Sequence, residues 1–221
     1  MKDLIVQALR EEARFTGGFL LLPEDRAMPG ESSKTGALDA VRKRLEGCQR
    51  CPLCRTVRHV VFGEGSPDAS VMFIGEAPGA VEDETGRPFV GPAGRLLTDI
   101  IEKGMGLRRS DVYIANIVKC RPPGNRDPLP EEIGGCSGFL DEQIGVIGPK
   151  VIVALGRIAA QTLLATETPI SRLRGRFGEY RGVKVMPTYH PSYLLHNPAR
   201  KRDVWEDIKT VMQELDIPLP G

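Results

Sequence analysis

A glycine-rich stretch with excess negative charge is the first feature that could carry chemistry. Residues 75–91 read GEAPGAVEDETGRPFVG, in which four glycines and two prolines surround four acidic residues and one phenylalanine. Glycine-rich loops that follow a strand commonly bind phosphate through backbone N–H groups. The acidic residues oppose that use, so the composition of this loop alone leaves its ligand open.

Five cysteines are the second such feature, at Cys48, Cys51, Cys54, Cys120 and Cys136. In a cytosolic chain, clustered cysteines favour metal or redox chemistry over disulfides. One C-x-x-C pair with two distant single cysteines differs from the paired knuckles of structural zinc sites. It suits a cluster that ties the N-terminal segment to the main sheet, and Cys₄ ligation of a [4Fe–4S] cluster fits. The pattern favours a metal over space-filling buried thiols, but it leaves iron–sulfur and zinc both open and the role of Cys54 ambiguous.

The elements that must position these residues alternate between strand and helix. Apolar runs bounded by glycine or polar residues predict strands at 60–65, 70–75, 111–119, 150–156 and 183–190. Helical spacing of apolar residues predicts helices at 1–15, 37–48, 93–106, 129–148, 157–165 and 201–215. This alternation favours a three-layer α/β/α fold with a mostly parallel central sheet.

The loops that follow the predicted strands point to one shared pocket. Residues 75–91, 120–130 and 190–199 each come directly after a strand pattern. In parallel sheets, ligands bind in the crevice beyond the carboxyl ends of the strands. We therefore expect these three loops to lie at the same edge of the sheet.

Length and charge set the remaining bounds. The 221 residues suit one domain over residues 37–221, preceded by an extension, 1–36, that holds a helix and a linker at 23–36 rich in Pro, Gly and Ser. A net charge of +1 means that nucleic-acid binding would need a local basic face. No apolar run is long enough to span a bilayer and no secretory signal is evident. The expectation is a cytoplasmic monomer without membrane association.

Three motifs together resemble a known family. They are FGEGSPDASVMFIGEAPGAVEDETGRPFVGPAGRLL at 62–97, YIANIVKCRPPGNRDPLPEE at 113–132 and HPSYLL at 190–195. With the cysteine pattern, they are similar to the iron–sulfur (family 4) uracil-DNA glycosylases. The resemblance runs from about residue 48 to about residue 215. It implies a monofunctional DNA glycosylase that hydrolyses the N-glycosidic bond of uracil flipped out of DNA and so initiates base-excision repair.

The resemblance also implies a cofactor and its ligands. The family holds a [4Fe–4S] cluster, and the matching positions are Cys48, Cys51, Cys120 and Cys136, which leaves Cys54 as an extra thiol. In the family, the cluster does not cleave the bond. A related branch traps uracil-DNA covalently through a histidine on a basic insertion, which NIVKCRPPGNRDPLP lacks. This chain is therefore expected to turn over.

Within that resemblance, six positions are candidates for binding the base, and Glu76 is one of them. A flipped base is recognised by stacking and by hydrogen bonds to its Watson–Crick edge. Phe89 is expected to supply the stacking face, and Asn116 the amide that pairs with uracil. His190 is expected to donate to uracil O2, where negative charge develops as the base leaves. Gly75 and Ala77 bring backbone N–H groups close to the base. The alternatives are a core aromatic at Phe89 and structural hydrogen bonds at Asn116 and His190.

The acidic residues of the same loop are candidates for catalysis. Positive charge grows on the sugar during glycosidic cleavage, and a nearby carboxylate stabilises it or activates water. Glu76, which lies nearest the strand end, is favoured over Glu82 and Asp83. Glu82 could instead crowd C5 of the base and exclude thymine. A solvated turn is the alternative for Glu82, Asp83 and Glu84.

Basic and apolar residues around the loops are candidates for contact with uracil-containing DNA. Leu194 and Leu195 could enter the stack that the base vacates, with helix packing as the alternative. The basic residues could bind phosphates, or they could form an ordinary solvated face. The candidates for phosphate binding are Arg121, Arg126, Arg174 and Arg200, with Arg172, Arg176, Lys201 and Arg202 beside them.

Two other functional classes stay open at this point. One is a non-catalytic iron–sulfur module that binds DNA or assists a polymerase on the same fold. The intact set of Glu76, Phe89, Asn116 and His190 argues against it. The other is a small redox protein, which the wide cysteine spacing disfavours. A protein that absorbs visible light but neither binds nor cuts uracil-DNA would support one of these two classes.

Overall fold

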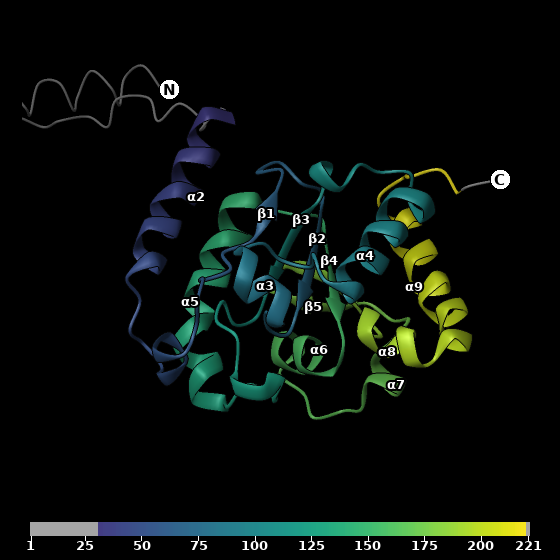
Figure 1. Ribbon diagram of the computed structural model, residues 1–221. Helices are drawn as coiled ribbons and strands as arrows, with labels where there is room; N and C mark the ends of the chain where they lie inside the picture. The colour runs from purple at the N-terminus through teal and green to yellow at the C-terminus, as the bar shows by residue number, and fades with distance from the viewer. Residues whose placement is uncertain (1–30, 220–221) are drawn as a thin grey trace, which may run out of the picture. The chain divides into compact units, whose positions relative to one another are not determined.

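The computed structural model describes residues 31–219, in which a six-stranded sheet has helices on both faces (Figure 1). The strand order is β1-β3-β2-β4-β6-β5; the four central strands run parallel and the two edge strands antiparallel. The strands are β1 (Glu64–Gly65), β2 (Val71–Gly75), β3 (Tyr113–Asn116), β4 (Val151–Leu155), β5 (Gly178–Tyr180) and β6 (Val183–Thr188). The predicted three-layer α/β/α architecture with a mostly parallel sheet is confirmed.

The central strands are buried on both faces. Every residue of β2 and of β4 is buried, as expected for parallel strands covered by helices on either side. Because side chains alternate along a strand, Met72 and Ile74 of β2 enter one core cluster, whereas Val71 and Phe73 enter the other. The sheet therefore separates two hydrophobic cores.

Each core is closed by its own helices (Figure 1). Helices α2, α5 and α6 pack on one face, and α4, α8 and α9 on the other. Helix α5 begins with Pro130 and is followed by Gly148 at φ 62°, residues that favour a helix start and a helix end respectively. The helices are α2 (Glu31–Glu46), α3 (Ala80–Thr85), α4 (Pro92–Asp99), α5 (Pro130–Ile147), α6 (Arg157–Leu164), α7 (Ile170–Leu173), α8 (Pro191–His196) and α9 (Lys201–Glu214), with a π-helical turn, Ile100–Gly104, extending α4.

Several boundaries differ from the sequence prediction. Helix α2 begins at Glu31, so the predicted linker is wrong over its last residues, while the predicted helix at 1–15 lies outside the described residues. The acidic loop contains α3, which Gly86 ends at φ 71°, and the loop after β6 contains α8. The predicted strand at 60–65 is reduced to β1, and the edge strand β5 was not predicted. Among the described residues, no helix is both long and apolar enough to cross a membrane.

Candidate active site

The carboxyl ends of four parallel strands meet at a cleft of about 390 Å³. Strand β2 leads into Glu76, β3 ends at Asn116, β4 leads into Gly156, and β6 leads into His190. All four residues line the cleft, together with Phe89 from the loop after α3. The prediction that strand-following loops share one pocket is therefore confirmed.

Asn116 presents a buried amide that is not satisfied within the described structure. The residue is 1% exposed, and neither its Nδ2 nor its Oδ1 has a hydrogen-bond partner there. The Asn116 backbone is fixed by the buried Lys119, whose Nζ donates to the Asn116 carbonyl oxygen at 2.9 Å. A buried polar group without a partner costs roughly 1–3 kcal/mol. The amide is thus positioned to pair with a ligand that offers one donor and one acceptor.

Phe89 lies directly over the end of β2. A Cβ on Gly75 would stand 2.4 Å from Phe89 Cζ and 2.6 Å from Asn116 Oδ1, so only glycine allows both side chains to approach. The Phe89 ring centroid is 5.7 Å from that of His190, with the planes tilted by 37°. Phe89 itself has φ of 51°, a left-handed conformation that is unusual for a bulky residue. The ring forms an apolar wall beside the unpaired amide.

His190 is neutral and its proton-bearing nitrogen can be assigned. The Ser192 N–H donates to His190 Nδ1 at 3.1 Å, which makes Nδ1 an acceptor and leaves the proton of a neutral imidazole on Nε2. Burial lowers the pKa of His190 to about 4, an effect that Glu82 partly opposes. Gly156 has φ of 91° and a Cβ there would lie 2.9 Å from His190 Cβ, so this glycine admits the ring.

Glu76 is the carboxyl group with the most perturbed ionisation in the cleft. Burial raises the pKa of Glu76 to about 7; the Asp127 carboxylate adds to the rise and the Arg157 guanidinium opposes it. Arg157 Nη2 and Asp127 Oδ2 form an ion pair at 2.5 Å, and Arg157 also lines the cleft. At neutral pH this carboxyl group is therefore poised between its two protonation states.

Comparison with known proteins places this geometry in a family. The profile of the Uracil DNA glycosylase superfamily matches residues 62–209. The type-4 uracil-DNA glycosylase of Thermotoga maritima is 48% identical over 176 residues, 78% of this chain and 91% of that protein. This chain belongs to the type-4 uracil-DNA glycosylases. The type-4 enzymes of Archaeoglobus fulgidus and Saccharolobus solfataricus are each 44% identical, and these matches cover 79% and 80% of this chain and 92% and 86% of those proteins.

The three carboxylates predicted to take part in catalysis lie in different places. Glu76 and Glu82 line the cleft. Glu82 Oε1 accepts hydrogen bonds from the backbone N–H groups of Val90 and Gly91 at 2.9 and 2.8 Å, a role in holding the loop that was not predicted. Asp83 does not line the cleft; it is buried, and its Oδ1 accepts from the Arg58 N–H at 2.9 Å. The acidic loop therefore places its carboxylates in three different environments.

The residues predicted to contact DNA also separate into different environments. Leu194 is 1% exposed and packs in the core beneath α8, which opposes a role as a wedge, whereas Leu195 is 43% exposed. Arg174 is committed to the fold: its Nη2 lies 2.7 Å from Oδ1 of the buried Asp207. Thr188 donates to the same Asp207 carboxylate at 2.6 Å.

The other predicted cations are more accessible. Arg126 lines the cleft and makes two hydrogen bonds to the buried Glu132, at 2.7 and 2.9 Å. Arg121 donates to Asn125 Oδ1 at 2.8 Å, and Arg200 pairs with an aspartate in the first turn of α9. Arg126 and Arg200 are exposed, and of the three only Arg126 lines the cleft.

All five cysteines line a single small pocket that α2, α5 and the segment after β3 enclose. Cys120 and Cys136 are buried, and the three cysteines of residues 48–54 are half-buried. Burial and the neighbouring cysteines raise the pKa of the Cys120 thiol to about 12. Across residues 31–219, no three His, Cys, Asp or Glu side chains are arranged as ligands of a single metal ion.

The sequence prediction missed Gly156, Arg157 and Ser192, which all line the cleft. Arg157 follows the buried strand β4, and Ser192 follows His190 by two positions. The signal for Arg157 was its place directly after an apolar strand run, the same argument that identified the other three loops. Ser192 in a helical first turn after a histidine carries no comparable signal, because its role depends on the His190 side chain turning back as the cap of α8.

Proposed function

We propose that this protein excises uracil from DNA as a uracil-DNA glycosylase, hydrolysing the bond between the base and its deoxyribose as the first step of base-excision repair. Membership of the type-4 family and the cleft together support the proposal. The observation that carries it is the buried, unpartnered amide of Asn116, which faces the same cleft as the neutral His190 and the ring of Phe89.

Uracil recognition follows from the hydrogen-bonding groups of Asn116. Its Oδ1 can accept from uracil N3–H while its Nδ2 donates to O4. Cytosine presents an acceptor at N3 and a donor at the 4-position. Its acceptor would face Oδ1 and its donor would face Nδ2, so neither hydrogen bond could form. Sites that hydrogen-bond a substrate in this way strongly reject an analogue that cannot make the bonds. Phe89 stacks on the extruded base, as aromatic side chains do on flipped bases.

His190 and Glu76 then divide the chemistry between base and sugar. The bond from C1′ to N1 breaks and its electron pair leaves on the base, where the Nε2–H of His190 stabilises the charge at O2. The Glu76 carboxylate stabilises the positive charge that grows at C1′ and accepts a proton from the water that attacks this carbon. A neutral imidazole can stabilise O2 because its Nε2–H donates while its Nδ1 accepts from the Ser192 N–H.

Contact with DNA is assigned to the accessible residues alone. Arg121 and Arg200 bind phosphates near the cleft, and the exposed Leu195 enters the space in the duplex that the base vacates. Arg126 contributes positive charge at the cleft wall. The protein acts on this substrate as a monomer.

The cysteine pocket is assigned to a [4Fe–4S] cluster held by Cys48, Cys51, Cys120 and Cys136. An all-sulfur donor set gathered in one pocket fits such a cluster, and the metal charge would offset the burial that raises the pKa of the Cys120 thiol. The bound cluster would join α2 and α5 to the end of β3 and takes no part in bond cleavage. Iron content and visible absorption should be lost in Cys136→Ser and kept in Cys54→Ser. The reverse result would show that Cys54, and not Cys136, is a ligand of the cluster.

The test of function is excision from a defined oligonucleotide. Purified protein is incubated with a strand that carries one uracil, and alkali then breaks the strand at abasic sites. We expect cleavage at uracil, none at thymine or cytosine in matched strands, and its loss in Asn116→Ala and His190→Ala. Absence of cleavage by protein that retains its iron would contradict the proposal and favour a DNA-binding module on the same fold.

A further inference from the structure

The backbone around Phe89 is held in an unfavourable conformation. Phe89 is a bulky residue at φ 51°, and such conformations persist only where surrounding contacts enforce them. Helix α4 supplies one contact, because a Cβ on Gly94 would lie 2.0 Å from the Phe89 carbonyl carbon and oxygen. Hydrogen bonds on both sides of Phe89 supply the others.

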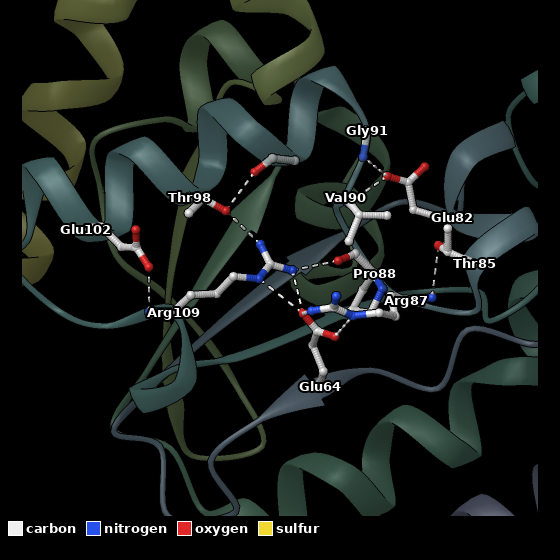
Figure 2. A network of polar contacts seen from close by, with 11 residues as sticks. Glu64, Glu82, Thr85, Arg87, Pro88, Val90, Gly91, Thr98, Glu102 and Arg109 are labelled. Carbon is white, nitrogen blue, oxygen red and sulfur yellow. Dashed lines mark hydrogen bonds and ion pairs between the residues drawn. The ribbon is translucent and has the colours of Figure 1, made fainter.

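Arg109 holds the residue that precedes Phe89 (Figure 2). Its Nη2 donates to the Pro88 carbonyl oxygen at 2.6 Å and to Glu64 Oε1 at 2.8 Å. Its Nη1 donates to Thr98 Oγ1 at 3.0 Å. The Arg109 side chain is 17% exposed, so water competes weakly for these bonds. A guanidinium is the side chain that can make this forked set of bonds at fixed angles.

Glu82 holds the two residues that follow Phe89 (Figure 2). Its Oε1 accepts from the N–H groups of Val90 and Gly91. The Pro88–Val90 turn is therefore anchored by a cation on its carbonyl side and by an anion on its amide side. Hydrogen bonds to charged groups are stronger than those between neutral groups. Both anchors act on backbone atoms, so the position of the ring is set without any direct contact between Arg109 and the base.

We propose that Arg109 is a positioning residue for base recognition, which acts by holding the Phe89 ring where it stacks on uracil. The inference rests on the proposed function, in which Phe89 supplies the stacking face. Arg109 lies outside all three family-like motifs and does not line the cleft. Its effect on the base must therefore pass through the backbone around Phe89, which it contacts at the Pro88 carbonyl. The neighbouring Arg108, whose side chain is 82% exposed and paired with Asp111, has no such connection.

A double-mutant cycle tests this connection, with free uracil as the probe. The inhibition constant of free uracil is measured for the wild type, Arg109→Met, Phe89→Ala and the double variant, with excision of uracil from a single-stranded oligonucleotide as the assay. Stacking on an aromatic ring is worth about 5- to 150-fold in affinity per base. We expect Phe89→Ala to weaken uracil within that range, Arg109→Met to weaken it at least about fivefold, and the two changes not to add.

The outcomes distinguish a failure of the positioning role from a failure of the proposed function. Arg109→Met should change the inhibition constant by less than about twofold when Phe89 is already alanine, and Arg108→Met should match the wild type throughout. Additive effects, or unchanged uracil binding in folded Arg109→Met, would overturn the positioning role. If Arg109→Met does not fold, Arg109→Lys enters the same cycle, because lysine keeps the pairing with Glu64 but cannot make the fork. A wild type that does not excise uracil would instead refute the proposed function.

Discussion

Replacing Glu76 with glutamine is expected to stabilise the protein while it removes activity. Burial places the pKa of Glu76 at about 7, above the ordinary value of 4.5. The folded state therefore holds this proton more tightly than the unfolded state does. Stability from this group is greatest below about pH 4.5, declines as the pH rises toward 7, and is constant above that value. Glutamine has the same shape and no proton to lose, so the decline should disappear.

The size of the effect follows from the difference in pKa. Each pH unit of that difference corresponds to about 1.4 kcal/mol of unfolding free energy, so the upper limit at pH 8 is about 3 kcal/mol. Glu76 opens onto a solvent-filled cleft, where screening reduces the value to roughly 1–2 kcal/mol. For a chain of this length, that difference corresponds to a rise in Tm of roughly 2–8 °C.

Thermal unfolding of the wild type and Glu76→Gln at pH 4, 6 and 8 measures this directly. The two proteins should unfold at the same temperature at pH 4, and the variant should be more stable at pH 8. Excision of uracil by the wild type should rise through pH 7 as Glu76 ionises, whereas any residual activity of the variant should not follow pH in that range. A variant that is less stable than the wild type at pH 8 would refute the burial argument.

Four further changes have expected outcomes that separate binding from folding. Asn116→Leu should lower excision by at least about 100-fold, measured in single turnovers, yet leave Tm unchanged or higher, because the amide it removes has no partner in the free protein; a lower Tm would indicate a hidden partner. Leu194→Ala should lower unfolding free energy by about 2–5 kcal/mol in denaturant titrations. Leu195→Ala should leave that free energy intact and slow excision from duplex more than from single-stranded DNA; equal slowing would exclude a wedge. Arg174→Met should lower the unfolding free energy by about 3–5 kcal/mol in the same titrations, because it leaves the buried Asp207 carboxylate without its counter-ion. It should leave the salt dependence of DNA binding unchanged; a shallower salt dependence would show that Arg174 does contact phosphate.

The layered architecture could be predicted because its strands are uniform apolar runs. Val71–Gly75 and Val151–Leu155 are buried along their whole length, and this pattern is visible without coordinates. Helices α3 and α8 were missed for a local reason. Each has only six residues and begins next to glycines or prolines, which are typical of loops. Strand β5 was missed because its pairing with β6 is a tertiary contact between short half-buried segments.

The candidate site was predictable where a residue type has few uses, and unpredictable where geometry decides. A buried asparagine within an apolar run has to find a partner, so Asn116 was a strong candidate before the structure was known. Neighbours in sequence such as Glu82 and Asp83 differ only in the direction in which a short helix points them. Leu194 and Leu195 differ in the same way, one inward and one outward. Sequence spacing alone cannot resolve such pairs without the helix phase.

Four separate strands position the residues of the cleft, so the onset of activity depends on the order in which the sheet forms. Residues 76, 116, 156 and 190 reach the cleft only when β2, β3, β4 and β6 are paired in register. A fragment that lacks any one of these strands cannot therefore hold the base, and a nascent chain is inactive until β6, the last parallel strand, has been synthesised and docked. Long-range strand pairing is slow compared with helix formation. During refolding, recovery of activity should lag behind the return of helical circular dichroism, which makes excision a reporter of the completed sheet.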